Sequence, residues 1–285
     1  ICHVSGLSGK AFICAENMYE PVRIEKEMTE SGLELYLANR WSSLSDFDRY
    51  CVECNMAIGS GTAVVIDLDK TVLGARGRNS HVIDEVRIQA VHNTVKRMLG
   101  QSFDKNDFGD VYEHFNGDSF HSFTSDNQDY LAYICLVICS GLFSKYQLEN
   151  DIKSGILQSF QQFIKIIEGQ KNDLMPNLEN IHSDIYTRVQ AGDPTPFKSF
   201  RHNEYLSTIE HMGKSTRAAS AEEILSSEIV VTEEVRDMAL VWKERGAILF
   251  GLSDKPDEAS IPSPDLARQG YVPIHQVEAW SIGGR

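Results

Sequence analysis

The sequence predicts an α/β fold in which a parallel sheet carries a long helical insertion. Two short apolar runs, at residues 63–66 and 247–252, are typical of strands buried on both faces of a parallel sheet. Between residues 80 and 227 apolar residues recur at helical spacing, and strand-like alternation does not stand out. We therefore expect a three-layer α/β core from residues 59–79 and 228–285, an all-helical domain from residues 80–227, and a small N-terminal module from residues 1–58.

The composition limits the class of protein. The 285 residues are 42% apolar and 24% charged, as in soluble globular proteins. A net charge of −14 argues against general affinity for nucleic acid or an anionic membrane. Apolar stretches fall short of the about 20 residues of a spanning helix, and a signal peptide is not visible. We expect a cytoplasmic protein without nucleic-acid or membrane partners.

The N-terminal module combines strand-like segments with cysteines. Cys51 and Cys54 form a Cys-x-x-Cys turn, which can direct two thiolates at one Zn²⁺. Cys2 would be a third ligand, with Cys14 or His3 as the fourth; alternatively, Cys2 pairs with a cysteine before Ile1. A closed site of this kind would be structural. The competing interpretation is that these cysteines are buried as small apolar groups. Six cysteines in a chain of this length are too few to indicate a disulfide scaffold.

Two carboxylates follow the first apolar run. Asp67 and Asp69 stand two residues apart where the strand should end, so they can converge on one point at its carboxyl end. Converging carboxylates repel unless a cation or a shared proton lies between them, and a hard cation such as Mg²⁺ is the usual solution. One carboxylate can then attack phosphorus while the other protonates the leaving oxygen and later activates water.

The segment Asp67-Leu68-Asp69-Lys70-Thr71-Val72 resembles the first motif of the haloacid dehalogenase (HAD) superfamily of phosphohydrolases. The resemblance implies a Rossmann-like core, Asp67 as nucleophile, Asp69 as acid and base, and Mg²⁺ held by Asp67 and the Asp69 carbonyl. Thr71 would support the loop by hydrogen bonding. The second aspartate favours a phosphatase over a dehalogenase, because carbon–halogen cleavage does not require protonation of the leaving group.

Arg76 and Arg78 lie just past this motif, among Gly74, Gly77 and Asn79. Two arginines in an otherwise acidic protein are a candidate substrate-phosphate segment. The alternative is a solvated hinge between domains.

Helical periodicity dominates the middle of the chain. We predict helices at 84–99, 126–146, 150–168, 178–189, 200–212 and 218–225. A helical block between two sheet strands resembles the cap of many HAD phosphatases, which implies closure over the site and substrate selection.

The α/β pattern resumes at Glu228. A helix is predicted at 235–245 with Thr232 as its cap, followed by the second strand and Ser253-Asp254-Lys255-Pro256. This succession is similar to the second HAD motif and implies that Ser253 binds phosphate. Lys255 would offset the charge of Asp67 and phosphate, a role that the family usually gives to a third-motif lysine.

The chain departs from the family after Ser253, because an acidic fourth motif is missing from the remaining sequence. Three explanations are open: Asp254 or Asp257 completes the Mg²⁺ site, the protein is degenerate, or chain is missing beyond Arg285. We expect a Mg²⁺-dependent phosphatase acting on a small phosphorylated substrate. The alternatives are a non-catalytic HAD-like binding or scaffold protein, and a phosphotransferase with an acceptor other than water.

Overall fold

The computed structural model describes residues 9–284 and shows a mixed α/β protein that divides into two compact units. The sheet unit comprises the residues up to Val86, Thr208–Asp254 and those from His275 onward, and the helical unit comprises Arg87–Ser207 and Lys255–Ile274. Two of the boundaries, after residues 86 and 207, fall inside helices. One reason is that Ile83, which is buried, lies against Gly74 of the sheet unit.

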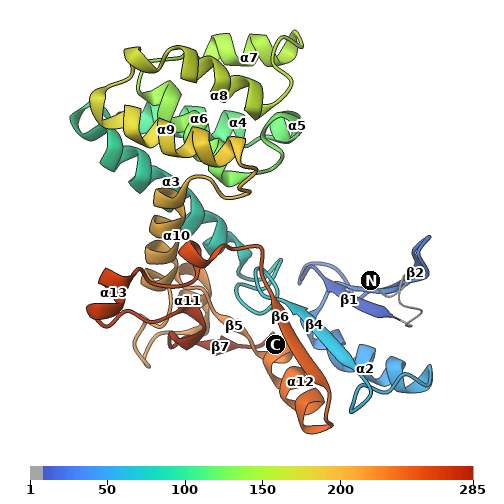
Figure 1. The fold of residues 1–285 in the computed structure, drawn as a ribbon. Coiled ribbons are helices and arrows are strands. Elements are labelled where there is room, and N and C mark those ends of the chain that lie inside the picture. Colours follow the sequence, from blue (N-terminus) through green and yellow to red (C-terminus); the bar gives the residue numbers. More distant parts are fainter. Residues whose placement is uncertain (1–8, 285) are drawn as a thin grey trace. The chain divides into compact units, whose positions relative to one another are not determined.

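The elements of the sheet unit are short and come from both ends of the chain (Figure 1). They are β1 (Lys10–Cys14), β2 (Ile24–Met28), β3 (Glu34–Ala38), a 3-10 turn (Trp41–Ser43), α2 (Leu44–Glu53), β4 (Ala63–Asp67), α11 (Ala221–Ser227), β5 (Val231–Thr232), α12 (Glu233–Glu244), β6 (Ile248–Leu252) and β7 (Ser281–Ile282). The helix α3 (Ser80–Leu99) begins in this unit, and α10 (Lys198–Glu210) ends in it.

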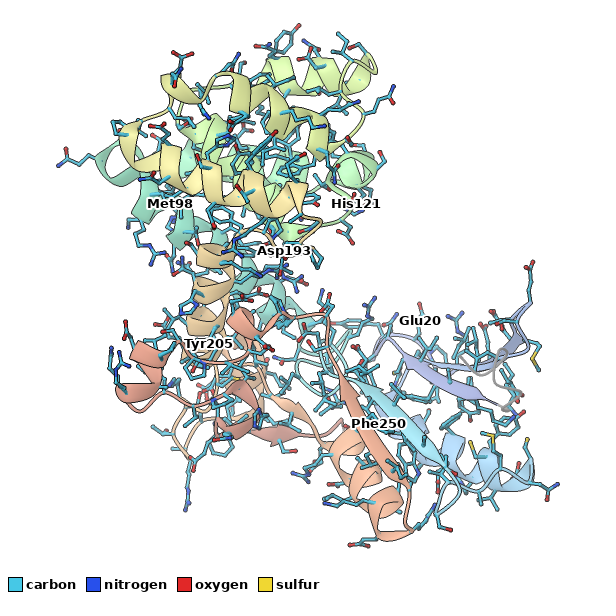
Figure 2. All side chains as sticks on the ribbon, viewed as in Figure 1. Glu20, Met98, His121, Asp193, Tyr205 and Phe250 are labelled. Carbon is cyan, nitrogen blue, oxygen red and sulfur yellow. The ribbon has the colours of Figure 1, made fainter. Side chains whose placement is uncertain are left out.

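The two predicted strands form one parallel pair. β4 and β6 lie side by side (Figure 1), in a register that sets Ala63 opposite Ile248 and Asp67 opposite Leu252. Within residues 9–284 this sheet has two strands. The expectation of burial on both faces is wrong: Val65 is 60% exposed, and Ile248, Leu252 and Phe250 (Figure 2) share the open face. An apolar run predicts a strand but not the layers that cover it.

The other face of β4 and β6 packs on the core of the sheet unit. Val64, Ile66 and Leu249 point to this core, which α12 joins with Val235 and Trp242. The N-terminal module contributes α2 and a separate sheet ordered β1-β3-β2, in which β3 pairs parallel with β1 and antiparallel with β2. Aromatic side chains pack between this sheet and α2: Phe12 and Tyr36 come from the sheet, Trp41 from the 3-10 turn and Phe47 from α2. The module and the β4–β6 pair thus share one hydrophobic core.

The helical unit has its own core. Its helices besides α3 and α10 are α4 (Lys105–Phe115), α5 (His121–Thr124), α6 (Gln128–Cys139), α7 (Lys145–Lys153), α8 (Phe160–Gly169), α9 (Pro176–Gln190) and α13 (Pro264–Arg268). The predicted helix at 150–168 is two helices, because Gly155 has a left-handed φ of 76° and ends the turn after α7. Across residues 9–284, no helix is both long enough and apolar enough to cross a bilayer.

Buried ion pairs connect the helices of this unit. Asp129 on α6, fully buried, accepts hydrogen bonds from the Phe197 amide (2.9 Å) and from Arg201 Nε (2.7 Å). Arg201 also donates to Glu204 (2.7 Å) on the next turn of α10. Burial raises the pKa of Asp129 despite the neighbouring guanidinium. The pairing compensates charges that would otherwise be costly in a hydrophobic interior.

Buried Phe160 stacks on Tyr130 with ring centroids 3.9 Å apart and stands edge-on to Tyr133. We predict that Phe160→Ala destabilises the protein by about 3–5 kcal/mol, because it leaves a cavity between α6 and α8. Ile156→Ala is the control, since Ile156 is exposed and its truncation should change stability by less than about 0.5 kcal/mol. Chemical denaturation measures both, and equal effects of the two substitutions would contradict the packing.

His182 on α9 is buried and lies between Tyr133 Oη (2.5 Å from Nδ1) and Glu168 Oε2 (2.9 Å from Nε2). Burial lowers the pKa of His182, although the hydrogen bond with Glu168 opposes this. As the pH falls below about 6.5, the unfolded chain gains a proton that folded His182 resists. Stability should therefore fall with pH in this range.

The substitution His182→Gln should flatten this pH dependence, whereas His275→Gln, at an exposed histidine, should preserve it. Unfolding free energies at a series of pH values test this. An unchanged slope in His182→Gln would show that another group is responsible.

Candidate functional site

The candidate site lies at the carboxyl ends of β4 and β6. Asp67 is the last residue of β4 and is exposed, and its register partner Leu252 is the last residue of β6. The Leu68 amide extends the ladder by donating to the Leu252 carbonyl (2.8 Å). Because the strands are parallel, Ser253 and Asp254 leave the sheet at the same edge as Asp67, and both are exposed.

A tight turn follows Asp67. Lys70 has a left-handed φ of 58°, the Leu73 amide donates to the Leu68 carbonyl (2.9 Å), and the Arg76 amide donates to the Lys70 carbonyl (2.8 Å). The Lys70 ammonium pairs with Asp84 at the start of α3 (2.7 Å). Asp69 is half-buried in this turn, where its backbone bridges Leu73.

Thr71 contacts the exposed carboxylate. Its hydroxyl donates to Asp67 Oδ2 over 3.0 Å, so one oxygen of Asp67 is held and the other is left to a ligand or solvent. The Thr71 carbonyl accepts a 2.6 Å hydrogen bond from the hydroxyl of Thr232. Thr232 occupies the N-cap position of α12, as predicted, but its hydroxyl is directed to the Thr71 peptide.

The two arginines of the neighbouring segment have different environments. Arg76 is exposed, and its carbonyl accepts the Glu16 amide (2.9 Å) and the Trp41 indole (3.2 Å). Arg78 is 5% exposed and donates to Glu16 (2.6 Å) and to Glu234 (2.8 Å). Burial lowers the pKa of Arg78, but these carboxylates outweigh it and hold the pKa above its ordinary value.

The backbone conformation and close packing at position 77 require glycine. Gly77 has a φ of 81°, and a Cβ there would lie 2.1 Å from the Glu16 carbonyl oxygen. The absence of a side chain lets the backbone of the loop approach the Glu16 backbone, just beyond β1, closely enough for Arg78 to reach the Glu16 carboxylate. The arginine and the glycine that suggested phosphate binding are thus engaged in packing within the sheet unit.

Lys255 belongs to the helical unit. Its side chain is 7% exposed, with the ammonium 3.8 Å from Glu204 Oε1. Burial raises the pKa of Glu204, but Lys255, Arg201 and Arg87 outweigh this and keep the pKa low. Lys255 therefore compensates a buried carboxylate of its own unit.

The cysteines of the N-terminal module lie in different settings. Cys14 on β1 and Cys51 on α2 are buried in the core of the sheet unit, and Cys54 is exposed at the end of α2. Burial raises the pKa of Cys14 to about 12 and that of Cys51 to about 11, which favours thiols over the thiolates that bind zinc. Cys2 lies outside the described residues, so a zinc site with these four ligands stays a prediction.

The donor set at the strand ends suits a hard cation. Within the part of the chain that the structure describes, no group of three or more His, Cys, Asp or Glu side chains is arranged to hold a metal ion. Mg²⁺ sites that handle phosphate commonly use one or two carboxylates and complete the shell with water and phosphate oxygens. Asp67 ends β4, Asp69 lies in the turn two residues later, and Asp254 lies two residues beyond β6, so a magnesium site with these ligands stays a prediction.

Sequence reasoning missed the residues that support the site. Asp84 was expected only as the start of a helix, Thr232 only as a cap, and Glu16 and Glu234 were not singled out as partners of Arg78. The sequence around Thr232 places a hydroxyl between an apolar segment and the acidic start of a helix. An ordinary N-cap has the same pattern, so the sequence could not reveal the contact of Thr232 with Thr71. The other contacts join segments far apart in the sequence.

Comparison of the chain with family models, with curated proteins and with solved structures gave no match.

The buried position of Arg78 gives a prediction that separates packing from substrate binding. We expect Arg78→Met to destabilise the sheet unit by about 3–5 kcal/mol, because it leaves Glu16 and Glu234 without their cation. Arg76→Met, at the exposed arginine, should change stability by less than about 0.5 kcal/mol. Chemical denaturation provides the measurement. If Arg78→Met kept full stability but bound inorganic phosphate more weakly than the native chain, Arg78 would be a substrate residue instead.

Proposed function

We propose that this chain is a Mg²⁺-dependent phosphoric monoester hydrolase of the HAD type, with Asp67 as its nucleophile. The single observation that supports this best is the parallel register of β4 and β6, with Asp67 opposite Leu252. It brings the end of the Asp-x-Asp strand and the start of the Ser253 loop to one edge of the sheet.

The local geometry supports the division of roles between the two carboxylates. Asp67 is exposed and has one oxygen held by Thr71, so the other oxygen is available for attack on phosphorus. Asp69 is half-buried in the turn two residues later, a position from which a carboxyl group can serve proton transfer. The helical unit follows this motif in the chain, where many HAD phosphatases carry a cap, and as a cap it would select the substrate.

Two steps follow from these roles. In the first, Asp67 attacks the phosphorus, the ester P–O bond breaks, and protonated Asp69 transfers its proton to the departing alkoxide. In the second, Asp69 takes a proton from water, the resulting hydroxide attacks the aspartyl phosphate, and inorganic phosphate leaves with Asp67 restored. Mg²⁺ bound by Asp67 and Asp69, with Asp254 as a further candidate ligand, would neutralise the charge shared by carboxylate and phosphate oxygens.

The phosphate contacts of the proposal rest on the strand ends. Ser253, one residue beyond β6, offers a hydroxyl to the phosphoryl oxygens. Transfer to an acceptor other than water would use the same first step, so a phosphotransferase is a variant of this proposal.

A second candidate is a non-catalytic HAD-like binding protein. The observation that favours it is that two cations expected near phosphate are engaged elsewhere: Arg78 with Glu16 and Glu234, and Lys255 with Glu204. Such a protein would keep the fold and bind a partner without turnover.

Hydrolysis of a generic aryl phosphate, with and without Mg²⁺, tests the proposal. We predict Mg²⁺-dependent turnover that Asp67→Asn abolishes and that Asp69→Asn reduces by about 10²–10⁴-fold, the usual contribution of acid–base catalysis. Asp237→Asn is the matched control, because Asp237 is an exposed acid of the same unit that pairs with Arg236.

Circular dichroism and melting temperature should be unchanged in Asp67→Asn, since the residue is exposed at a strand end. Turnover retained in that variant would remove the mechanism. Binding of phosphate without any turnover in the native chain would favour the second candidate.

A further inference from the structure

Thr232 lies at the point where several parts of the sheet unit meet. It is fully buried, it ends β5, and it precedes the first residue of α12. Its hydroxyl donates to the Thr71 carbonyl (2.6 Å), and its amide donates to the Val72 carbonyl (2.8 Å). Two consecutive peptides of the turn after Asp67 are therefore held by one residue.

We propose that Thr232 is a positioning residue for the Asp67 carboxylate and acts through Thr71. This inference rests on the proposed function, because it assigns Thr232 a role in orienting the nucleophile. The relay has two hydrogen bonds in sequence: the Thr232 hydroxyl fixes the Thr71 peptide, and the Thr71 hydroxyl then donates to Asp67 Oδ2 (3.0 Å). Orientation of the attacking oxygen depends on both bonds.

The backbone around Thr232 is itself anchored, so it can serve as a fixed reference. β5 pairs parallel with β7, with Thr232 opposite Ile282, and the Val231 amide donates to the Trp280 carbonyl (2.7 Å). On the other side, the Gly74 amide donates to the Val230 carbonyl (2.9 Å). Backbone hydrogen bonds therefore connect the turn to the β5–β7 pair, in addition to side-chain packing.

The hydroxyl is the part of Thr232 that the inference depends on. Threonine and valine have nearly the same shape, so Thr232→Val removes the donor and leaves the Thr71 carbonyl with one fewer partner. Thr232→Ser keeps the donor and loses a methyl group. A purely structural role would follow shape and would be better preserved by valine, whereas a positioning role follows the hydroxyl.

Steady-state kinetics with the aryl phosphate and Mg²⁺ form the first part of the test. Thr232→Val should lower kcat by about 10–100-fold, with KM within about twofold of the native value, because the carboxylate is misoriented after the substrate is bound. Thr232→Ser should restore kcat. In the Thr71→Val background, Thr232→Val should cause no further loss, because the relay is already broken.

Amide hydrogen exchange of Leu73 and Gly74 is the second part and does not depend on activity. Exchange should be about tenfold faster in Thr232→Val and native-like in Thr232→Ser. Thr124→Val is the matched control, because Thr124 is a buried threonine of the helical unit whose hydroxyl also donates to a carbonyl, that of Phe120 (3.2 Å). It should leave kcat and the exchange of the turn unchanged.

The outcomes separate this inference from the proposed function. Native kcat and native exchange in Thr232→Val would overturn the role of Thr232. An inactive native chain would overturn the proposed hydrolase and with it the role of Thr232 in positioning the nucleophile, while faster exchange in the valine variant would still show that Thr232 holds the turn. If Thr232→Val does not fold, Thr232→Cys, which has a weakly donating thiol of similar size, replaces it in the same measurements.

Discussion

The parallel pairing of β4 with β6 is the constraint on which the site depends. Parallel strands direct their carboxyl ends to one edge, so a register with Asp67 opposite Leu252 determines where Ser253 and Asp254 begin. These strands are separated in the chain by the whole helical unit. A shift of this register by one residue would change which residues meet at the edge and would turn Val64 and Ile66 away from the core.

Around this pairing, the sheet unit holds the turn after Asp67 by contacts that leave Asp67 exposed. Arg78 joins the loop to the segment after β1 through Glu16 and to α12 through Glu234, and Thr232 joins it to β5. The buried, charge-compensated groups make the loop rigid, while the exposed carboxylate of Asp67 stays available to a ligand. Because the protein as a whole is acidic, the proposed binding of phosphate depends on local hydrogen-bond donors such as the Ser253 hydroxyl.

Sequence alone predicted the features that depend on local pattern. The apolar run before Asp67 identified β4. Gly246, which ends the helix predicted at 235–245, and the apolar run after it located β6. Features that depend on distant partners were missed: Arg78 meets Glu16 and Glu234, which are 62 and 156 residues away in the chain. The open face of the β4–β6 sheet was likewise unpredictable, because an apolar strand does not reveal how many layers cover it.

Reductive trapping tests the central claim most directly. The native chain would be incubated with Mg²⁺ and acetyl phosphate, treated with borohydride, digested and analysed by mass spectrometry. Borohydride reduces an aspartyl phosphate to homoserine, so our account predicts homoserine in place of Asp67, with Asp69 and Asp254 unchanged. Homoserine at another aspartate, or an unmodified Asp67 under conditions in which phosphate is released, would contradict the claim that the end of β4 receives the phosphoryl group.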